Sequence, residues 1–337
     1  MIRVLKTIDA HAAGQPLRLV VEGMPSPVGA TMLRKQQWLV RHADHLRRSL
    51  MLEPRGHADM CGALFTSPVS PGAHAGVLFM HAAGYTPICG HGVIAAVTIA
   101  VERQLIFDRP GLDAAGPTIT LDTTAGTVQA RARMGGDHRR VDTVSFTNVP
   151  SFVCGAGHVV KLRTRELRVD IAFGGAFYAM VDTEAIGLPL DAGAIPELRR
   201  VASEIREGLH GSPSIAHPVH AGLSGLDGVI FTGPPRAPAA HLRSLTVFAD
   251  AAIDRSPCGT GTSAVMAVLD AMGLLPAGEP FVHESVIGTV FRGRIARRTQ
   301  VGDLPAIVPE IEGSAWITGE HTFLVDDDDP LREGFTV

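Results

Sequence analysis

The chain has 337 residues, of which 45% are hydrophobic, 19% charged and 5% aromatic, and its formal net charge is −4 at pH 7. This length predicts two domains, or one large pseudo-symmetric domain, with a sizeable core built mainly from aliphatic side chains. The sequence contains no basic patch with interleaved aromatic residues and no run of about 18 apolar residues. We therefore expect neither a nucleic-acid partner nor a membrane span.

Alternating and helical patterns along the chain predict a mixed α/β fold. The expected strands, some of which contain turns, cover residues 3–11, 17–24, 61–69, 74–82, 117–134, 139–153, 167–183, 226–233, 241–250, 280–299 and 314–326. The expected helices cover residues 30–54, 92–105, 194–210 and 262–275. The helices at 92–105 and 262–275 are apolar on nearly all sides, so each should be buried as the core of its own domain.

A C-G-x-G motif stands before each of these two apolar helices, in PICGHGVIAAV and in DRSPCGTGTSAVM. The two motif cysteines, Cys89 and Cys258, lie 169 residues apart in a chain of 337, which is half its length. Phe79 and Phe248 both lie ten residues before their cysteine. The spacing predicts an internal duplication, with two similar halves that each carry the motif at the start of a central helix.

The remaining cysteines give no metal or disulfide pattern. The chain has four cysteines, none in a CxxC pair, and no regularly spaced histidine or carboxylate ligands stand beside them. Cys154 has no partner motif and is interpreted as structural. Because the first residues lack the apolar run of a secretory signal, we expect a cytoplasmic protein with reduced thiols. The ligand spacing predicts no metal site, and we expect no cofactor.

The position of the motif cysteines suggests acid/base chemistry on a carboxylate ligand. A helix N-terminus offers unpaired N–H groups and partial positive charge, which bind carboxylates and favour a thiolate. If the halves bring Cys89 and Cys258 to opposite faces of one ligand, the pair could remove a Cα proton and return it from the other side. The backbone donors would stabilise the carbanion. Cysteines that are merely buried apolar groups are the alternative, whereas phosphate-loop and serine-hydrolase motifs are absent.

Several segments resemble the proline racemase family, which includes proline racemase, 4-hydroxyproline 2-epimerase and trans-3-hydroxy-L-proline dehydratase. These segments are MLEPRGHADM, CGHGVIAAV, VPSFV, RVDIAFGGAFYA and DRSPCGTGTSA. The resemblance extends from TIDAH to GEHTFLVD. It implies an α/β fold of the α+β type, similar to diaminopimelate epimerase. Two pseudo-symmetric halves would each wrap a central helix in a mostly antiparallel sheet, with the active site between them.

The implied halves are residues 1–155, with Cys89, and residues 156–314, with Cys258. Strands at about 315–337 are expected to return to the first half. Within these halves the resemblance also implies residue roles. Cys89 and Cys258 are similar to the two acid/base cysteines, Asp254 to the group that contacts the ring nitrogen, and Phe248 to an apolar wall of the pocket. The groups implied to hold the substrate carboxylate are Gly90, His91, Gly259 and Thr260. Without the resemblance, Asp254 would be interpreted as a turn residue in DRSP and His91 as a loop histidine.

Two features bear on the reaction. The family's dehydratases commonly carry threonine at the second cysteine position, so Cys258 favours racemisation or epimerisation. The segments LKTIDAHAAGQPLR and GHADMCGALFTSP, however, are similar to those of dehydratase members. Cys61 stands where proline racemases tend to have a bulky aromatic residue. A cysteine leaves more room, so we hypothesise that the pocket accepts a hydroxylated proline.

The leading interpretation is a cofactor-independent racemase or epimerase that acts at Cα of proline or hydroxyproline. The alternative is a trans-3-hydroxy-L-proline dehydratase that forms Δ1-pyrroline-2-carboxylate, because that elimination starts with the same proton removal. A non-catalytic carboxylate-binding protein is the remaining alternative. The expected partner is a small-molecule substrate, and the sequence leaves open whether the protein is a homodimer.

Overall fold

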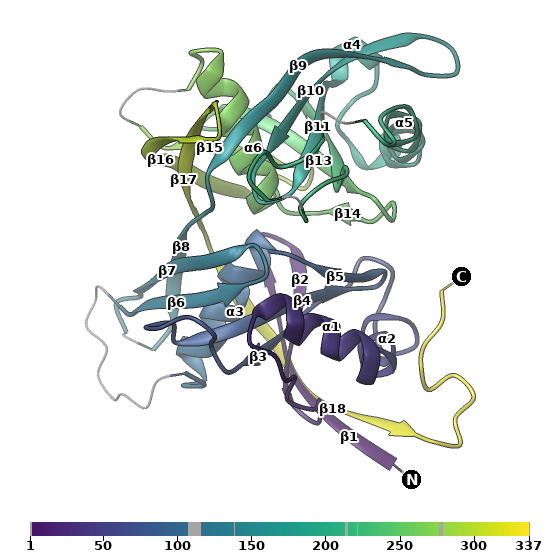
Figure 1. Ribbon diagram of the computed structural model, residues 1–337, viewed down its shortest axis with the longest axis vertical. Coiled ribbons are helices and arrows are strands. Elements are labelled where there is room, and N and C mark those ends of the chain that lie inside the picture. Colours follow the sequence, from purple (N-terminus) through teal and green to yellow (C-terminus); the bar gives the residue numbers. More distant parts are fainter. Residues whose placement is uncertain are drawn as a thin grey trace. The chain divides into compact units, whose positions relative to one another are not determined.

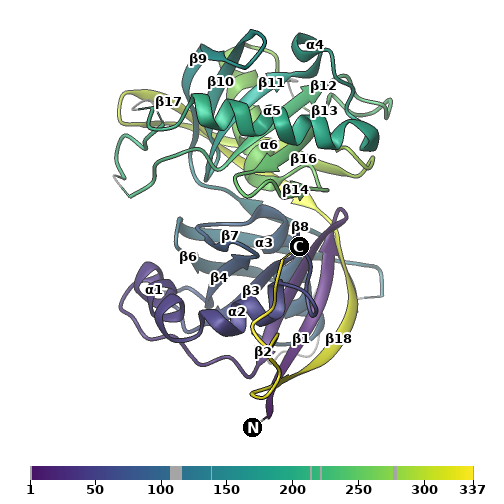
Figure 2. The same cartoon turned by 90° about the vertical axis from the view of Figure 1, so that its right-hand side faces the viewer.

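The computed structural model describes residues 2–106, 116–137, 139–212, 215–220, 222–275 and 279–336. The chain forms two compact units (Figures 1 and 2). The first unit consists of Met1–Phe146 and Gly313–Val337, and the second consists of Thr147–Glu312.

The first unit contains nine strands and three helices among its described residues. The strands are β1 (Ile2–Ala12), β2 (Gln15–Glu22), β3 (Cys61–Thr66), β4 (Ala75–His81), β5 (Gly84–Thr86), β6 (Thr118–Thr123), β7 (Gly126–Met134), β8 (Val141–Thr147) and β18 (Ala315–Asp326). The helices are α1 (Met32–His42), α2 (Asp44–Met51) and α3 (Gly90–Glu102).

The described part of the second unit also contains nine strands. They are β9 (Ser151–Lys161), β10 (Glu166–Phe173), β11 (Phe177–Asp182), β12 (Gly228–Gly233), β13 (Leu242–Phe248), β14 (Ile253–Asp254), β15 (Phe281–Ser285), β16 (Val290–Val301) and β17 (Leu304–Gly313). The helices are α4 (Thr183–Ile186), the short 3₁₀ helix η1 (Ala192–Ala194), α5 (Ile195–Gly208) and α6 (Gly259–Ala271).

The strand pairings repeat from one unit to the other. In the first unit, β1 pairs antiparallel with β2 and β18, β2 parallel with β3, and β3 antiparallel with β4. β4 then pairs antiparallel with β5 and parallel with β6. In the second unit, β10, β11, β12, β13, β14 and β15 repeat this pattern in the same order, with β9 in the place of β18. The topology therefore confirms the internal duplication predicted from the paired motif.

The two apolar helices lie at the centre of their units, as predicted. Every residue of α3 from Gly90 to Val101 is buried, and α3 packs against β1, β2, β7 and β18. Every residue of α6 from Gly259 to Val268 is buried, and α6 packs against β9, β10 and β16. Figure 1 shows strands around each helix. Because burial of a Val or Ile side chain contributes about 1.5–3 kcal/mol, these helices fix the position of the motif at their N-termini.

The segment expected as one helix at residues 30–54 is two helices, which corrects the prediction. α1 begins after Thr31, whose hydroxyl accepts a hydrogen bond from the Arg34 N–H. The chain leaves helical geometry at Ala43, where φ is −142°, and α2 begins at Asp44. The Asp44 carboxylate binds Arg47 one turn later, at 2.6 Å. Negative charge in the first turn favours a new helix start, a signal that the apolar spacing alone does not contain.

The division of the chain differs from the expected boundary after residue 155. That position lies inside β9, which pairs along its length with β10 and so belongs to the second unit. The observed division falls after Phe146, at the end of β8. At the other end, β18 pairs with β1 in the first unit.

Among the described residues, we find no helix with both the length and the apolar character needed to cross a membrane.

Candidate active site

Cys89 caps the N-terminus of α3. It has extended backbone geometry (φ −135°), is half-buried, and its carbonyl accepts the first helical hydrogen bond, from Val93 N–H at 2.8 Å. Its Sγ lies 3.4 Å from the ring nitrogens of His91, which is buried. A Cβ on Gly92 would lie 2.9 Å from this Sγ and 2.7 Å from the Phe79 ring. Only glycine therefore leaves room for the thiol at this position.

Cys61 is the first residue of β3 and pairs with His81 of β4. The Gln15 amide lies 3.9 Å from the Cys61 Sγ. The hydrogen bond with Cys89, assisted by His91 and opposed by burial, holds the pKa of Cys61 well below its usual value. A thiolate is thus readily formed within this pair.

The loop before Cys61 is held by a buried ion pair. Arg18 of β2 binds Asp9 of β1 at 2.8 Å and donates to the carbonyl oxygens of Leu50, at 2.8 Å, and Arg55, at 2.5 Å. Removing one partner of such a pair leaves a buried charge uncompensated, which costs about 3–5 kcal/mol. The ion pair therefore connects the β1–β2 hairpin to the loop that leads into Cys61.

Cys258 caps the N-terminus of α6, but in a different conformation. Its φ of +63° lies in the left-handed region, which costs a non-glycine residue about 1–3 kcal/mol. The side chain is 3% exposed, and its Sγ accepts a hydrogen bond from Gly261 N–H at 3.4 Å. The Cys258 carbonyl accepts from Thr262 N–H at 2.6 Å. The turn therefore directs this thiol back over the first turn of the helix.

A short polar chain leads from Asp254 to Cys258. One carboxylate oxygen of Asp254 accepts hydrogen bonds from Ser256 N–H at 2.9 Å and from the Ser256 hydroxyl at 2.6 Å. The Cys258 N–H donates to the Ser256 hydroxyl oxygen at 3.1 Å. Burial, and then the negative charge of Asp254, raise the pKa of Cys258 to about 12. Cys258 is therefore a protonated thiol near neutral pH.

Two hydroxyl groups lie beside the Cys258 thiol. The Thr260 hydroxyl is 3.6 Å from Sγ, and the Tyr178 hydroxyl is 2.7 Å from that of Thr260 and 3.8 Å from Sγ. Burial, followed by the charge that Cys258 would carry, raises the pKa of Tyr178 well above its usual value. Tyr178 thus stays protonated and can donate. Sequence reasoning missed it, although a tyrosine hydroxyl in the apolar strand segment GGAFYA needs a partner once buried.

A second residue missed by the sequence analysis lies behind the motif. His283 of β15 is fully buried, and its Nδ1 lies 2.8 Å from the Thr262 hydroxyl, which donates to the Pro257 carbonyl at 3.2 Å. Burial lowers the pKa of His283 to about 3, so the ring is neutral. The Thr262 hydroxyl therefore links Pro257, the residue before Cys258, to His283 in β15.

The structure brings the predicted residues together within each unit. Cys61, Cys89 and His91 form one group in the first unit, with Gly90 buried at the start of α3. In the second unit Cys258 and Thr260 are in contact, and Asp254 connects to Cys258 through Ser256. Gly259 is buried at the start of α6. Phe248 ends β13, the strand whose Thr246 pairs with Asp254, and is partly exposed.

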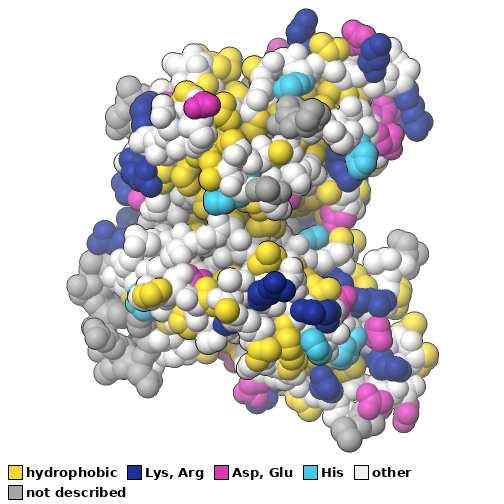
Figure 3. All heavy atoms as spheres, in the orientation of Figure 1, with side chains coloured by type: hydrophobic (Ala, Val, Ile, Leu, Met, Phe, Trp, Pro, Cys, Tyr) yellow, Lys and Arg dark blue, Asp and Glu magenta, His cyan; other side chains and the backbone are white. Residues whose placement is uncertain are grey.

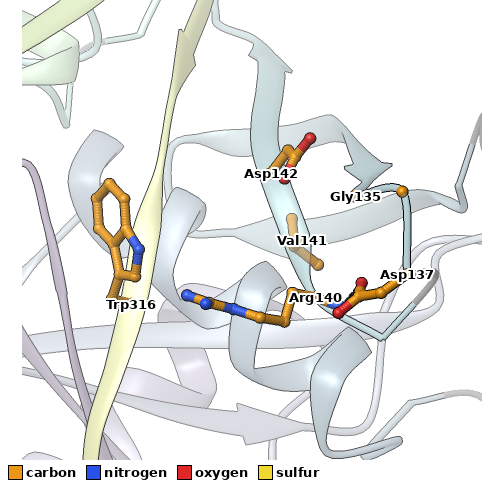
Figure 4. A pocket seen from close by; sticks show the side chains of 7 residues that line it. Gly135, Asp137, Arg140, Val141, Asp142 and Trp316 are labelled. Atoms are coloured by element: carbon orange, nitrogen blue, oxygen red, sulfur yellow. Dashed lines mark hydrogen bonds between the residues drawn. The ribbon is translucent and has the colours of Figure 1, made fainter.

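Figure 4 shows a separate hollow in the first unit, at the turn between β7 and β8 and beside β18. Its lining residues are Gly135, Gly136, Asp137, Arg140, Val141, Asp142 and Trp316. The Arg140 side chain extends towards Trp316, and none of the predicted site residues lines the hollow.

On the face in Figure 3, charges of both signs are interspersed. In the described residues, His, Cys, Asp and Glu side chains form no group of three or more that could hold a metal ion.

The whole chain is similar to known proteins. The Proline racemase family matches residues 7–336. A trans-3-hydroxy-L-proline dehydratase of Bacillus cereus is 43% identical over 333 residues, which cover 99% of this chain and 98% of that protein. A 3-hydroxyproline 2-epimerase of Burkholderia multivorans is 42% identical over 341 residues, and a proline racemase of Clostridioides difficile is 39% identical over 338 residues. In both cases 99% of this chain and 98% of the relative are covered.

Solved structures agree in fold. A hydroxyproline epimerase of Agrobacterium vitis, with bound trans-4-hydroxy-L-proline, matches with a TM-score of 0.90 at 29% identity and covers 99% of this chain and 95% of that one. A PhzF-family phenazine biosynthesis protein of Bacillus anthracis matches with a TM-score of 0.60 at 10% identity, over 95% of this chain and 99% of that one. The second similarity concerns the fold alone. Together these matches confirm the predicted fold class.

Proposed function

Because this chain belongs to the proline racemase family and is an enzyme of that family, we propose that Cys89 and Cys258 exchange the Cα proton of a proline-type imino acid. The observation that carries the proposal is the position of each cysteine at the N-terminus of the buried central helix of a duplicated unit. The leading reaction is the 2-epimerisation of a hydroxyproline or the racemisation of proline, without a cofactor.

The helix N-termini would hold the substrate carboxylate. The first N–H groups of any helix lack helical partners. In α3 the first helical bond is made by Val93 N–H, so the N–H groups of Gly90 and His91 precede it. In α6 the first helical hydrogen bond is made by Thr262 N–H. The N–H groups of Gly259 and Thr260 precede it and would bind the ligand. These donors would also stabilise the charge that moves onto the carboxylate when Cα loses its proton.

The two thiols suit opposite roles. Cys89 lies at the N-terminus of α3 with its Sγ 3.4 Å from the His91 ring, and such surroundings favour a thiolate, so Cys89 would act as the base that removes the Cα proton. Cys258 keeps its proton and would donate it to the opposite face of the carbanion. After this step Cys89 is a thiol and Cys258 a thiolate. The hydroxyls of Thr260 and Tyr178 would stabilise that thiolate by hydrogen bonds.

A dehydratase is the second candidate, favoured by the names of relatives at 41–43% identity. Cys89 would again remove the Cα proton. The Cα–H electron pair would then form a Cα–Cβ double bond as the 3-hydroxyl leaves as water, with the proton of Cys258. The resulting enamine tautomerises to Δ1-pyrroline-2-carboxylate. Both candidates require that the two cysteines reach one substrate.

Incubation in D₂O with four substrates tests the proposal and separates the candidates. The substrates are L-proline, trans-4-hydroxy-L-proline, cis-4-hydroxy-D-proline and trans-3-hydroxy-L-proline, followed by NMR. An epimer with deuterium at Cα indicates the leading reaction, and Δ1-pyrroline-2-carboxylate from the 3-hydroxyl compound indicates the second. If no substrate gains deuterium or loses water, the proposal fails.

The size of the pocket can be tested at Cys61. A Cys61→Phe variant would place an aromatic ring beside Cys89, and we expect it to lose activity on hydroxyprolines more than on proline. Full activity on hydroxyprolines would contradict the specificity hypothesis. A cytoplasmic location fits the proposal, because both catalytic cysteines must stay reduced.

A further inference from the structure

Arg243, in β13, is a buried cation that lacks a close anionic partner. It is 3% exposed, its Nε donates to the Ser285 carbonyl oxygen at 3.3 Å, and its Nη2 donates to that of Val286 at 2.6 Å. Over the described residues, no carboxylate lies within ion-pair distance of this guanidinium, and Nη1 donates to no group. Because buried charges are usually paired, an unused donor on a buried arginine points to an anionic ligand.

The charges around Arg243 compensate its cation only in part. Burial, and then the positive charge of Arg236, lower the pKa of Arg243, whereas Glu284 and Asp191 act in the opposite direction. The Glu284 carboxylate already accepts hydrogen bonds from the Arg236 N–H at 2.7 Å and from the Ala237 N–H at 3.2 Å. A further negative charge beside Arg243 would therefore be stabilised.

Arg243 lines a hollow of about 430 Å³. The hollow is formed by α4 and the residues after it, by the residues after β12 and by Arg243 itself, all within the second unit (Figure 2). Its volume lies within the range of small-molecule sites, about 300–1,000 Å³. The exposed residues Arg236 and Glu184 supply two further charges. The apolar part of the lining consists of Leu188, Pro189, Leu190, Pro234 and Pro235.

The first unit shows that the duplicated topology does not require an arginine at this place. Gly76 of β4 pairs in parallel register with the acidic residue Asp122 of β6. Arg243 of β13 pairs in the same way with the acidic residue Glu284 of β15, so the two positions are equivalent. A Cβ on Gly76 would lie 2.8 Å from the sulfur of Met32 in α1, because a helix covers that side of β4. The arginine is therefore a feature of the second unit and not of the repeated fold.

We propose that this hollow binds a small organic anion that has one carboxylate group and an apolar body. The carboxylate oxygens would accept hydrogen bonds from Arg243 and Arg236, since guanidinium donors match a carboxylate in geometry and charge. The apolar body would lie against the prolines and leucines of the lining. Because Glu184 also lines the hollow, a second negative charge on the ligand would be repelled.

The proposed anion site is separate from the paired cysteine motifs. None of the residues that line the hollow is among those assigned to proton transfer or to the substrate carboxylate. The anion site therefore does not rest on the proposed function, and either proposal can fail without the other.

Titration of the full-length protein with hexanoate, followed by ligand-observed NMR, tests the site. Hexanoate carries one carboxylate and an apolar chain, and its binding should be saturable in the millimolar range or below. Hexanol lacks the charge and should bind at least about tenfold more weakly, because hydrogen bonds to charged groups are lost. Inorganic phosphate lacks the apolar body and carries more charge, so it should also bind more weakly than hexanoate.

Arg236→Gln provides the decisive comparison. Arg236 is exposed, whereas the loss of Arg243 would also leave the carbonyls of the turn between β15 and β16 without their donor. We expect Arg236→Gln to weaken hexanoate binding by about tenfold. The matched control Arg168→Gln, which removes the same charge from an exposed position of β10, should bind like the wild type.

Three results would overturn the proposal. The first is the absence of saturable hexanoate binding, and the second is equally tight binding of hexanol or phosphate. The third is the same hexanoate affinity in the wild type and in Arg236→Gln, because the ligand would then bind elsewhere. Arg243 would in each case only hold the turn between β15 and β16 through its two carbonyl partners.

Discussion

The two units place the same motif at the same point of the same topology, yet they surround its cysteine differently. Cys89 has extended geometry, is half-buried and contacts His91 and Cys61. Cys258 has a φ of +63°, is buried and lies beside Tyr178 and Thr260. The duplicated backbone supplies two equivalent helix N-termini. The side chains around the first include Cys61, a thiol of lowered pKa, whereas the cysteine at the second, Cys258, keeps its proton.

This difference has a clear electrostatic cause. In the first unit, Cys89 and His91 lower the pKa of Cys61, and the His91 ring lies 3.4 Å from the Cys89 sulfur. Near Cys258, the apolar surroundings and the charge of Asp254 oppose an anion more than Thr260, Gly261 and Tyr178 favour it. A proton exchange between two faces of one carbon needs such a pair of a base and an acid.

The largest expected effect is the loss of either motif cysteine. Cys89→Ser and Cys258→Ser should each lower kcat by about 10²–10⁴-fold, the usual contribution of general acid/base catalysis. Cys154→Ser, in β9, should keep wild-type activity. Steady-state assays on the substrate identified in D₂O would check this. A variant of one motif cysteine that retained normal kcat would contradict the two-base account.

The first-turn glycines should respond unequally. A Cβ at Gly92 would lie 2.7 Å from the Phe79 ring and 2.9 Å from the Cys89 sulfur, whereas a Cβ at Gly261 would lie 3.0 Å or more from its neighbours. We expect Gly92→Ala to lower stability by about 1–3 kcal/mol and to displace the thiol, and Gly261→Ala to cost less. Urea unfolding and kcat would measure both. The opposite order would show that the first site has more free space than the contacts indicate.

The raised pKa of Cys258 predicts a pH dependence of stability. The unfolded chain ionises this thiol near pH 9 and the folded chain near 12, so above pH 9 the unfolded chain binds fewer protons. The contribution is fully present below pH 9 and is lost as the pH rises towards 12, by up to about 1.4 kcal/mol per pH unit.

Urea unfolding at several pH values would reveal this loss. The fall in stability above pH 9 should be shallower in Cys258→Ala than in the wild type. Cys61→Ala, which removes a thiol whose pKa is lowered, should leave the fall unchanged. Identical slopes in the wild type and Cys258→Ala would contradict a raised pKa at Cys258.

The smallest effect is expected at Tyr178. Tyr178→Phe removes a hydroxyl that lies 2.7 Å from Thr260 and 3.8 Å from the Cys258 sulfur. The loss of about one hydrogen bond, near 1–1.5 kcal/mol, should lower kcat by up to about tenfold. The pH profile of kcat should also change on the alkaline side, because the Cys258 thiolate loses a donor. An unchanged profile would indicate that the hydroxyl only supports Thr260.

The sequence predicts those parts of the site that depend on local pattern. The duplicated motif and the two apolar helices suffice to place Cys89 and Cys258 at helix N-termini in equivalent halves. Contacts between distant strands are different, because they depend on register. The approach of Cys61 to Cys89 requires β3, β4 and α3 to pack together, and the contact of Tyr178 with Thr260 joins β11 to α6. The break at Ala43 was missed because apolar spacing continues through it.

The pH dependence of cysteine alkylation tests the central claim, the difference between the two thiol sites, most directly. Iodoacetamide labelling of each cysteine, followed by mass spectrometry from neutral to alkaline pH, gives a midpoint for each site. The midpoint is the quantity to compare, because burial alone slows the rate. The account predicts that the Cys61–Cys89 pair begins to react at a pH well below the Cys258 midpoint. Equal midpoints, or a lower midpoint at Cys258, would contradict it.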